Sequence, residues 1–284
     1  MRQNNCFVDL HTHSNASDGQ YSPSELVHLA RKASVEILAL TDHDTTAGLQ
    51  EARRTAEALG IHFVDGIELD SKYPSIGGRF HILGYGIDSA HEELKGCCSG
   101  YAQQRLERAG RILTYLEKKG ISIPFSKIEE LAGGGVIGRP HFARAMVEAG
   151  FVATIQEAFE RFLDTEEFQT IDRPKPHPRQ AIEMITKAGG LAVLAHPYQI
   201  KLGEHSLEDL LRELKSYGLA GMECYYSSHT QQQTEALLSL ARQYELCITA
   251  GSDFHGELVK PGVSLGTVSK QALSQNGESI LNRL

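Results

Sequence analysis

The sequence predicts an α/β protein in which a parallel sheet is wrapped by helices. Short apolar runs alternate with amphipathic helical segments in residues 1–91 and again after residue 173. Between them, residues 92–172 have a helical pattern almost throughout. The chain has 284 residues, of which 41% are hydrophobic, so it is long enough for one large domain with an insert.

The first part of the sheet is expected within residues 1–91. Apolar runs predict strands at 6–8, 37–40, 62–69 and 80–87. A helix is expected to begin after Ser22, because Ser22 and Glu25 form a capping-box sequence with Pro23 at the first helical position. A second helix is predicted from Ala47 to Leu59.

Residues 92–172 are predicted to form a helical insert that caps the substrate site. Arg105, Arg108 and Arg111 are spaced three residues apart, which indicates a solvated helix face, with phosphate binding as the alternative. The proline-rich stretch 173–178 is interpreted as the linker that returns to the sheet. Residues 173–284 then supply further strands at 191–195, 221–225 and 247–250, whereas the tail from Lys260 carries no motif.

The overall charge and the cysteines restrict the class of protein. A net charge of −8 argues against a duplex DNA partner but leaves room for a local phosphate pocket. No apolar run is long enough to span a membrane, and residues 1–5 are polar, so we expect no signal peptide. Five cysteines without C-x-x-C spacing indicate reduced thiols and a cytoplasmic protein.

The chemistry is expected where polar residues follow the strands. His11 and His13 come directly after the first strand, and residues two apart on an extended strand point to the same side. Taken alone, the pair fits a metal site and a hydrogen-bonded histidine pair equally well. Similar residues accompany the other strands: His43, Glu68, His81, His196, Asp253 and His255. The carboxyl ends of parallel barrel strands meet on one face, so these groups predict a site for several metal ions.

Five segments in order resemble the motifs of PHP (polymerase and histidinol phosphatase) phosphoesterases. They are residues 9–14 (DLHTHS), 41–44 (TDHD), Glu68, 195–197 (AHP) and 251–255 (GSDFH). The resemblance implies a distorted seven-stranded β/α barrel with two or three metal ions at its top face. It also implies manganese, while nitrogen and oxygen ligands without thiolate suit zinc and iron(II) as well.

The same resemblance implies which residues bind each ion. His11, His13, Glu68 and Asp253 would surround the first ion. Glu68 would bridge to a second ion, which His81 and His196 complete. A third would use Asp18, His43 and His255, although Asp18 also suits a plain turn in Ser17-Asp18-Gly19.

Within the family, the helical insert is most similar to bacterial nucleotide phosphatases. By this resemblance Arg139 and His141 bind the substrate phosphate; the alternative for Arg139 is a salt bridge at a helix start. Ser228 and His229 match a segment that lines the pocket, and His229 or a solvent molecule would protonate the leaving group. The branch often has Gly-Arg-Tyr after His-Pro, whereas residues 198–200 here are Tyr-Gln-Ile, so an arginine beside the metals is replaced.

These features predict metal-assisted hydrolysis of a nucleotide phosphomonoester, with Glu68, Asp253 and His229 as catalytic residues. The expected reaction converts a 3′,5′-nucleoside bisphosphate into a 5′-nucleotide and phosphate, with 5′-to-3′ exoribonuclease activity on short RNA as a further activity. The alternatives are a histidinol-phosphate phosphatase and a non-catalytic module that metal stabilises. No protein partner is predicted.

Overall fold

The computed structural model describes residues 6–266 and 268–284. The polar segment 1–5, in which we expect no signal peptide, lies outside the described residues. Among the described helices, none has both the length and the apolar character that crossing a membrane requires.

The core of the protein is a sheet of eight strands in the order β10-β1-β2-β3-β5-β6-β8-β9. Their bounds are β1 Phe7–Asp9, β2 Val35–Leu40, β3 His62–Ser71, β5 Phe80–Tyr85, β6 Leu191–Leu194, β8 Gly221–Tyr226, β9 Cys247–Gly251 and β10 Val268–Ser269. The N–H of Leu10, just past β1, donates to the carbonyl of Ala250 in β9 over 2.9 Å. The two ends of the sheet therefore nearly meet, and the predicted α/β barrel is confirmed.

Two strands of the sheet, β5 and β10, run against the other six. β5 pairs antiparallel with both of its neighbours, so that Ile82 lies opposite Leu69 of β3 and Leu194 of β6. The prediction of a parallel sheet is therefore wrong for β5. His81 instead stands near the amino end of β5, and this end reaches the rim where β3 and β6 finish. A separate pair, β4 (Gly77–Gly78) and β7 (Ile200–Lys201), also runs antiparallel.

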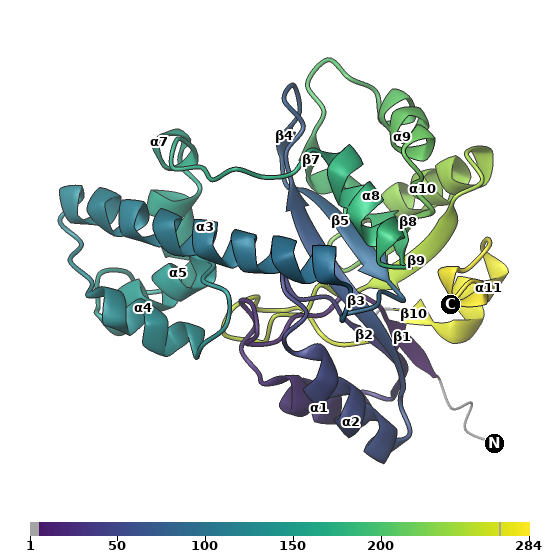
Figure 1. Ribbon diagram of the computed structural model, residues 1–284, viewed down its shortest axis with the longest axis horizontal. Coiled ribbons are helices and arrows are strands. Elements are labelled where there is room, and N and C mark those ends of the chain that lie inside the picture. The colour runs from purple at the N-terminus through teal and green to yellow at the C-terminus, as the bar shows by residue number, and fades with distance from the viewer. Residues whose placement is uncertain (1–5, 267) are drawn as a thin grey trace.

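Helices cover the outside of the barrel (Figure 1). They are α1 Pro23–Lys32, α2 Leu49–Leu59, α8 Pro178–Lys187, α9 Leu207–Ser216, α10 Gln231–Gln243 and α11 Lys270–Gln275, with short 3-10 turns at Pro197–Gln199 and Ile280–Asn282. The predicted capping box is present, because Ser22 accepts from the Glu25 N–H and the Glu25 side chain accepts from the Ser22 N–H. Leu26, Val27 and Ala30 form the face of α1 that is buried against the barrel.

The remaining helices extend to one side of the barrel, as Figure 1 shows. They are α3 Glu92–Lys118, α4 Phe125–Ala132, α5 Arg139–Glu148, α6 Ile155–Ala158 and α7 Glu166–Gln169, with a π-helical turn at Phe159–Leu163. Side chains such as Ile112, Phe142 and Phe168 form a second buried apolar cluster here, while Leu94 at the start of α3 packs in the barrel core. The division into residues 1–91, 92–172 and 173–284 stays a prediction.

Close packing at the end of β9 determines how closely β9 approaches the segment that follows β1. A Cβ atom built on Gly251 would overlap the Cβ of His11 and the Oε1 of Glu223. Only glycine fits without displacing these two side chains. The backbone of β9 therefore approaches His11 directly.

We predict that Gly251→Ala lowers the free energy of unfolding by about 1–3 kcal/mol, the usual cost of overpacking a dense interior. Gly96→Ala is the matched control, because a Cβ on this exposed glycine of α3 meets nothing within 4 Å. The control should be neutral or gain up to about 1 kcal/mol from improved helix propensity. Urea unfolding of both variants measures the difference, and equal stabilities would contradict the packing argument.

Candidate metal centre

Glu68, near the carboxyl-terminal end of β3, is the centre of the site. Its side chain is 1% exposed and lies among five imidazoles. Glu68 Oε2 lies 3.2 Å from His11 Nε2, 3.2 Å from His13 Nε2 and 3.1 Å from His43 Nδ1, and Oε1 lies 2.7 Å from His81 Nδ1 and 3.1 Å from His196 Nε2. Each carboxylate oxygen therefore faces its own set of histidines.

Two further carboxylates approach the same histidines from the other side. Asp253 Oδ1 lies 3.2 Å from His13 Nε2 and 3.5 Å from His11 Nε2. His255 connects the two carboxylates, because its Nδ1 lies 3.3 Å from Asp253 Oδ1 and its Nε2 lies 3.3 Å from Asp18 Oδ1. Asp18 is thus part of the cluster and not a residue of an isolated turn.

The donor atoms form three overlapping groups, each within 4.8 Å, that could hold an ion. The groups are His11, His13, Glu68 and Asp253; His13, Asp18, His43 and His255; and His43, Glu68 and His81. His196 lies beside these groups, because its Nε2 is 3.1 Å from Glu68 Oε1 and 3.1 Å from His81 Nδ1. The structure thus brings all nine candidate ligands together, although they span 245 positions from His11 to His255.

The residues present fit divalent cations because many donor atoms are buried without hydrogen-bond partners. Among the described residues these atoms include His11 Nε2, both ring nitrogens of His13, His43 Nδ1, Glu68 Oε2 and His196 Nδ1. A buried polar atom without a partner costs about 1–3 kcal/mol, so such a concentration would be strongly destabilising by itself. Cations satisfy these lone pairs together, and none of the three groups contains a cysteine.

Electrostatics within the cluster are consistent with this interpretation. Burial alone would raise the pKa of Glu68, but the positive charges of His43, His81 and His11 hold it well below its usual value. Burial would likewise lower the pKa of His13, yet the nearby carboxylates of Asp253 and Glu68 raise it to about 9. The carboxylates are therefore ionised at neutral pH and attract positive charge, either protons on the imidazoles or metal ions.

Glu223 is a functional residue that the sequence reasoning missed. It is fully buried on β8, its Oε1 lies 3.0 Å from His11 Nδ1, and its Oε2 accepts from the His196 N–H over 2.7 Å. A carboxylate on the second ring nitrogen of a metal-binding histidine fixes the tautomer and the ring orientation. The available signal was a lone charged residue in the apolar strand Gly221–Tyr226.

The insert is attached to the rim of the barrel by buried ion pairs. Arg105 of α3 and Arg173 of the return segment each place Nη2 2.6 Å from Asp44 Oδ2, and Arg173 Nη2 also lies 3.0 Å from Asp70 Oδ2. Asp70 Oδ1 in turn lies 3.5 Å from His81 Nε2. Arg105 is 8% exposed, so the interpretation of the α3 arginines as a solvated face is wrong for this residue. The sequence pattern could not reveal the ion pair between Arg105 and Asp44, because the two residues are far apart in sequence.

The predicted phosphate-binding residues lie at the start of α5. The guanidinium of Arg139 pairs with Asp164 and stacks on Phe159, with its Cζ 5.4 Å from the ring centroid. His141 is 1% exposed, and its Nδ1 accepts from the Gly138 N–H over 2.9 Å. Burial lowers the pKa of His141 to about 4, so the ring is neutral at pH 7 with its proton on Nε2. Gly138 itself packs against Asp18, which places this helix start beside the cluster.

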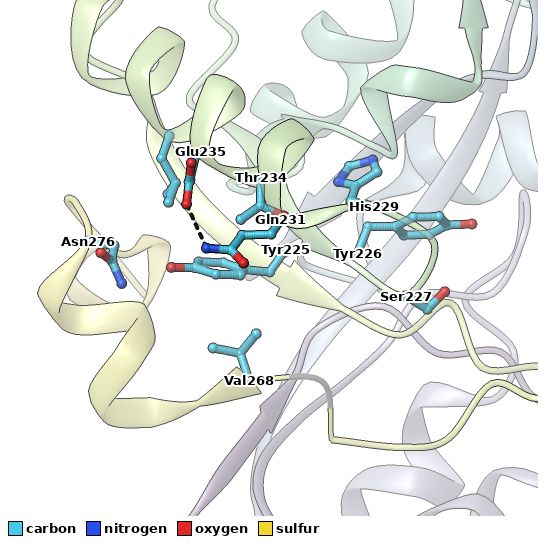
Figure 2. Close-up of a pocket in the computed structure, with 10 residues that line it drawn as sticks. Tyr225, Tyr226, Ser227, His229, Gln231, Thr234, Glu235, Val268 and Asn276 are labelled. Atoms are coloured by element: carbon cyan, nitrogen blue, oxygen red, sulfur yellow. Dashed lines mark hydrogen bonds between the residues drawn. The ribbon is translucent and has the colours of Figure 1, made fainter.

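Ser228 and His229 follow β8, outside the cluster itself. Ser228 is exposed, whereas the ring of His229 lies 5.1 Å from the ring of Tyr226. His229, Tyr225 and Tyr226 line a cavity of about 500 Å³, and the rings of the two tyrosines point in opposite directions (Figure 2). Tyr226 thus connects His229 to the cluster, because its hydroxyl donates to Asp253 Oδ2 over 2.8 Å.

Comparison with known proteins agrees with this site. A family model described as "PHP domain" matches residues 9–165. The chain is 36% identical over 247 residues to a 5′-3′ exoribonuclease of Haemophilus influenzae, an alignment that covers 87% of the chain and 89% of the relative. The chain belongs to the PHP family.

Two further PHP relatives carry different names. A 3′,5′-nucleoside bisphosphate phosphatase of Chromobacterium violaceum is 34% identical over 251 residues, covering 87% of each protein. A phosphoribosyl 1,2-cyclic phosphate 1,2-diphosphodiesterase of Eggerthella lenta is 32% identical over 252 residues, 88% of the chain and 94% of the relative. The phosphatase and exoribonuclease names match the predicted branch, whereas the cyclic-phosphate enzyme was not among the predicted alternatives.

Solved structures show the same PHP architecture. A Chromobacterium violaceum structure described as an amidohydrolase with bound sulfate and no metal superposes with a TM-score of 0.86 at 31% identity and covers 98% of the chain and 95% of its own. A metal-dependent phosphoesterase structure from Bifidobacterium adolescentis superposes with a TM-score of 0.82 at 29% identity, covering 97% and 98%. The protein is therefore an enzyme, a metal-dependent phosphoesterase.

We predict that Arg173→Met lowers the free energy of unfolding by about 3 kcal/mol, because it leaves Asp44 and Asp70 buried with one cation fewer. Arg179→Met is the matched control, since this exposed arginine pairs with Glu183 one helical turn away and lies over the Tyr217 ring, both at the surface. Chemical denaturation should show no change for the control. If both variants unfold at the same denaturant concentration, the buried pairs do not stabilise the attachment of the insert.

Proposed function

We propose that this PHP enzyme releases phosphate from 3′,5′-nucleoside bisphosphates and leaves the 5′-nucleotide. The observation that carries the proposal is the set of three overlapping donor groups, two of which share Glu68, because a phosphate ester needs several positive charges close together to be hydrolysed. The names of the Chromobacterium and Haemophilus relatives support nucleotide substrates. Short RNA with a 5′ phosphate is the second expected substrate, at the same site.

We assign the ligands as follows. His11, His13, Glu68 and Asp253 bind a first ion; Glu68, His81 and His196 a second; and Asp18, His43 and His255 a third. Cations bound there supply Lewis-acid activation of water and of the phosphate group. The nitrogen and oxygen donors suit Mn²⁺, our first choice, and also Zn²⁺ or Fe²⁺.

The chain's own residues then hold the ligands and the substrate in place. Glu68 presents one oxygen to each histidine set, and Glu223 holds His11 so that its Nε2 faces Glu68. His141, with its proton on Nε2, donates a hydrogen bond to a phosphate oxygen, and Arg139 adds a permanent charge at the same helix start. These contacts orient the phosphorus for in-line attack by water.

His229 and Ser228 are proposed to contact the leaving nucleoside. Burial lowers the pKa of His229, so the imidazole is mainly neutral at pH 7. Its Nε2 is buried and has no hydrogen-bond partner among the described residues. We therefore favour a neutral hydrogen-bonding role for His229, with solvent as the source of the proton for the leaving oxygen.

A second candidate is hydrolysis of a cyclic ribose phosphate, which the near-full-length Eggerthella relative supports. Histidinol phosphate is the third. A panel of adenosine 3′,5′-bisphosphate, a 5′-phosphorylated RNA trimer, a ribose 1,2-cyclic phosphate and histidinol phosphate, assayed in Mn²⁺ buffer, separates them. If phosphate is released fastest from the bisphosphate, the result supports the proposal. If another substrate is hydrolysed fastest, the proposal is wrong and that substrate takes its place.

We predict that Glu68→Gln lowers kcat at least about a hundredfold, because the change removes the charge shared by two ligand groups and several kcal/mol of transition-state stabilisation. Glu107→Gln on the exposed face of α3 is the control and should keep wild-type turnover. Phosphate release from adenosine 3′,5′-bisphosphate measures both. Full turnover by correctly folded Glu68→Gln would exclude this mechanism.

We also predict that removal of metal destabilises the fold. The unpartnered donors lose their cations, so thermal unfolding in a chelator should occur at a lower temperature than in Mn²⁺. At an Mn²⁺ concentration a hundred times the Kd, the expected difference is about 2.7 kcal/mol. Identical melting curves with and without metal would show that the cluster does not bind an ion.

We place the enzyme in the cytoplasm. Its five cysteines are at positions 6, 97, 98, 224 and 247, and the four from Cys97 onward are free thiols, although Cys97 and Cys98 are neighbours on α3. Reduced thiols are typical of proteins from that compartment.

A further inference from the structure

The two oxygens of Asp253 have different surroundings. Oδ1 faces the histidines of the cluster at 3.2–3.5 Å. Oδ2 instead accepts from the Lys260 ammonium over 2.6 Å and from the Tyr226 hydroxyl over 2.8 Å. Both lone pairs of Oδ2 are therefore used by protein donors, which leaves Oδ1 as the oxygen that is available to an ion.

Lys260 is held in this position by several contacts. Its ammonium also lies 2.9 Å from the Tyr226 hydroxyl oxygen and 5.0 Å from the ring centroid of Tyr226. The loop that carries it is tied to Gln20, whose Oε1 accepts from the Leu258 N–H over 2.9 Å, and the Lys260 N–H donates to the Gly256 carbonyl. The side chain is 27% exposed, so it lies at the edge of the site and is not a freely mobile surface lysine.

Asp253 is itself fixed by its backbone. Its φ of 56° lies in the left-handed region, which is uncommon for a residue with a side chain, and its N–H donates to the His11 carbonyl over 2.7 Å. Burial would raise the pKa of Asp253, but Lys260, His11 and His255 hold it well below its usual range. The carboxylate is thus ionised, held in one orientation and partly neutralised on one side only.

We propose that Lys260, together with Tyr226, is a positioning residue that restricts Asp253 to binding its ion through a single oxygen. The inference rests on the proposed role of Asp253 as an ion ligand. The number of carboxylate oxygens at a site influences which cation it prefers. Ca²⁺ takes six to eight oxygen ligands and readily accepts both oxygens of a carboxylate, whereas smaller ions prefer fewer ligands in stricter geometry. Lys260 therefore discriminates against Ca²⁺.

The experiment compares the affinities of Mn²⁺ and Ca²⁺ for metal-free protein by isothermal titration calorimetry. In Lys260→Met, Oδ2 is released, and the ratio of Ca²⁺ to Mn²⁺ affinity should rise about tenfold or more, the usual size of an effect on a ligand's hydrogen-bonding partner. Lys260→Arg keeps the charge and the donors and should restore most of the wild-type ratio. With Mn²⁺ present, Lys260→Met should lower kcat and leave KM for adenosine 3′,5′-bisphosphate unchanged.

Lys127→Met is the matched control, because Lys127 is 29% exposed and also pairs with carboxylates, Glu130 and Glu148, on the insert. An unchanged affinity ratio in Lys260→Met would overturn the inference, and so would a change in KM alone, which would make Lys260 a substrate contact. If Lys260→Met does not fold, Tyr226→Phe removes the other donor to Oδ2 and must raise the ratio in its place. Wild-type protein that binds neither ion would refute the proposed metal centre itself.

Discussion

A buried carboxylate surrounded by imidazoles is the constraint on which the rest of the structure depends. Glu68 is almost fully enclosed, and five histidines lie within 3.2 Å of its two oxygens. Such a group cannot be placed in a protein interior without compensating charge. The barrel supplies the geometry, because loops far apart in sequence end at the same rim, and cations supply the charge. The fold and the chemistry therefore need each other.

Around this centre, a second layer of charged side chains orients the residues that we propose as metal ligands. Glu223 holds His11 and the backbone of His196, while Asp70 faces the far nitrogen of His81. Lys260 does the same for one oxygen of Asp253. Each of these contacts leaves one donor atom of the ligand directed at the interior. The layer thereby converts a flexible set of side chains into a rigid set of donors.

The barrel and its rim could be predicted because they rest on local patterns. Alternation along the extended segment after β1 placed His11 and His13 on one side, and apolar runs located β2, β3 and β9 to within a few residues. The antiparallel direction of β5 could not be predicted, since both directions have the same residue pattern. Arg173 and Lys260 were missed for a related reason: each lay in a stretch interpreted as linker or tail, and their meaning depends on partners at Asp44 and Asp253.

The ion pairs at Asp44 have a consequence for how this enzyme family diversifies. Arg105 near one end of the insert and Arg173 just beyond the other converge on the same carboxylate oxygen. The polypeptide between them leaves the barrel and returns to it at nearly one point, and it carries its own apolar interior. Mutations, insertions or exchanges in the part of that excursion away from Gly138 and the start of α5 can accumulate without disturbing the rim. New substrate specificities can therefore evolve in the helical segment while the cluster at the rim stays unchanged.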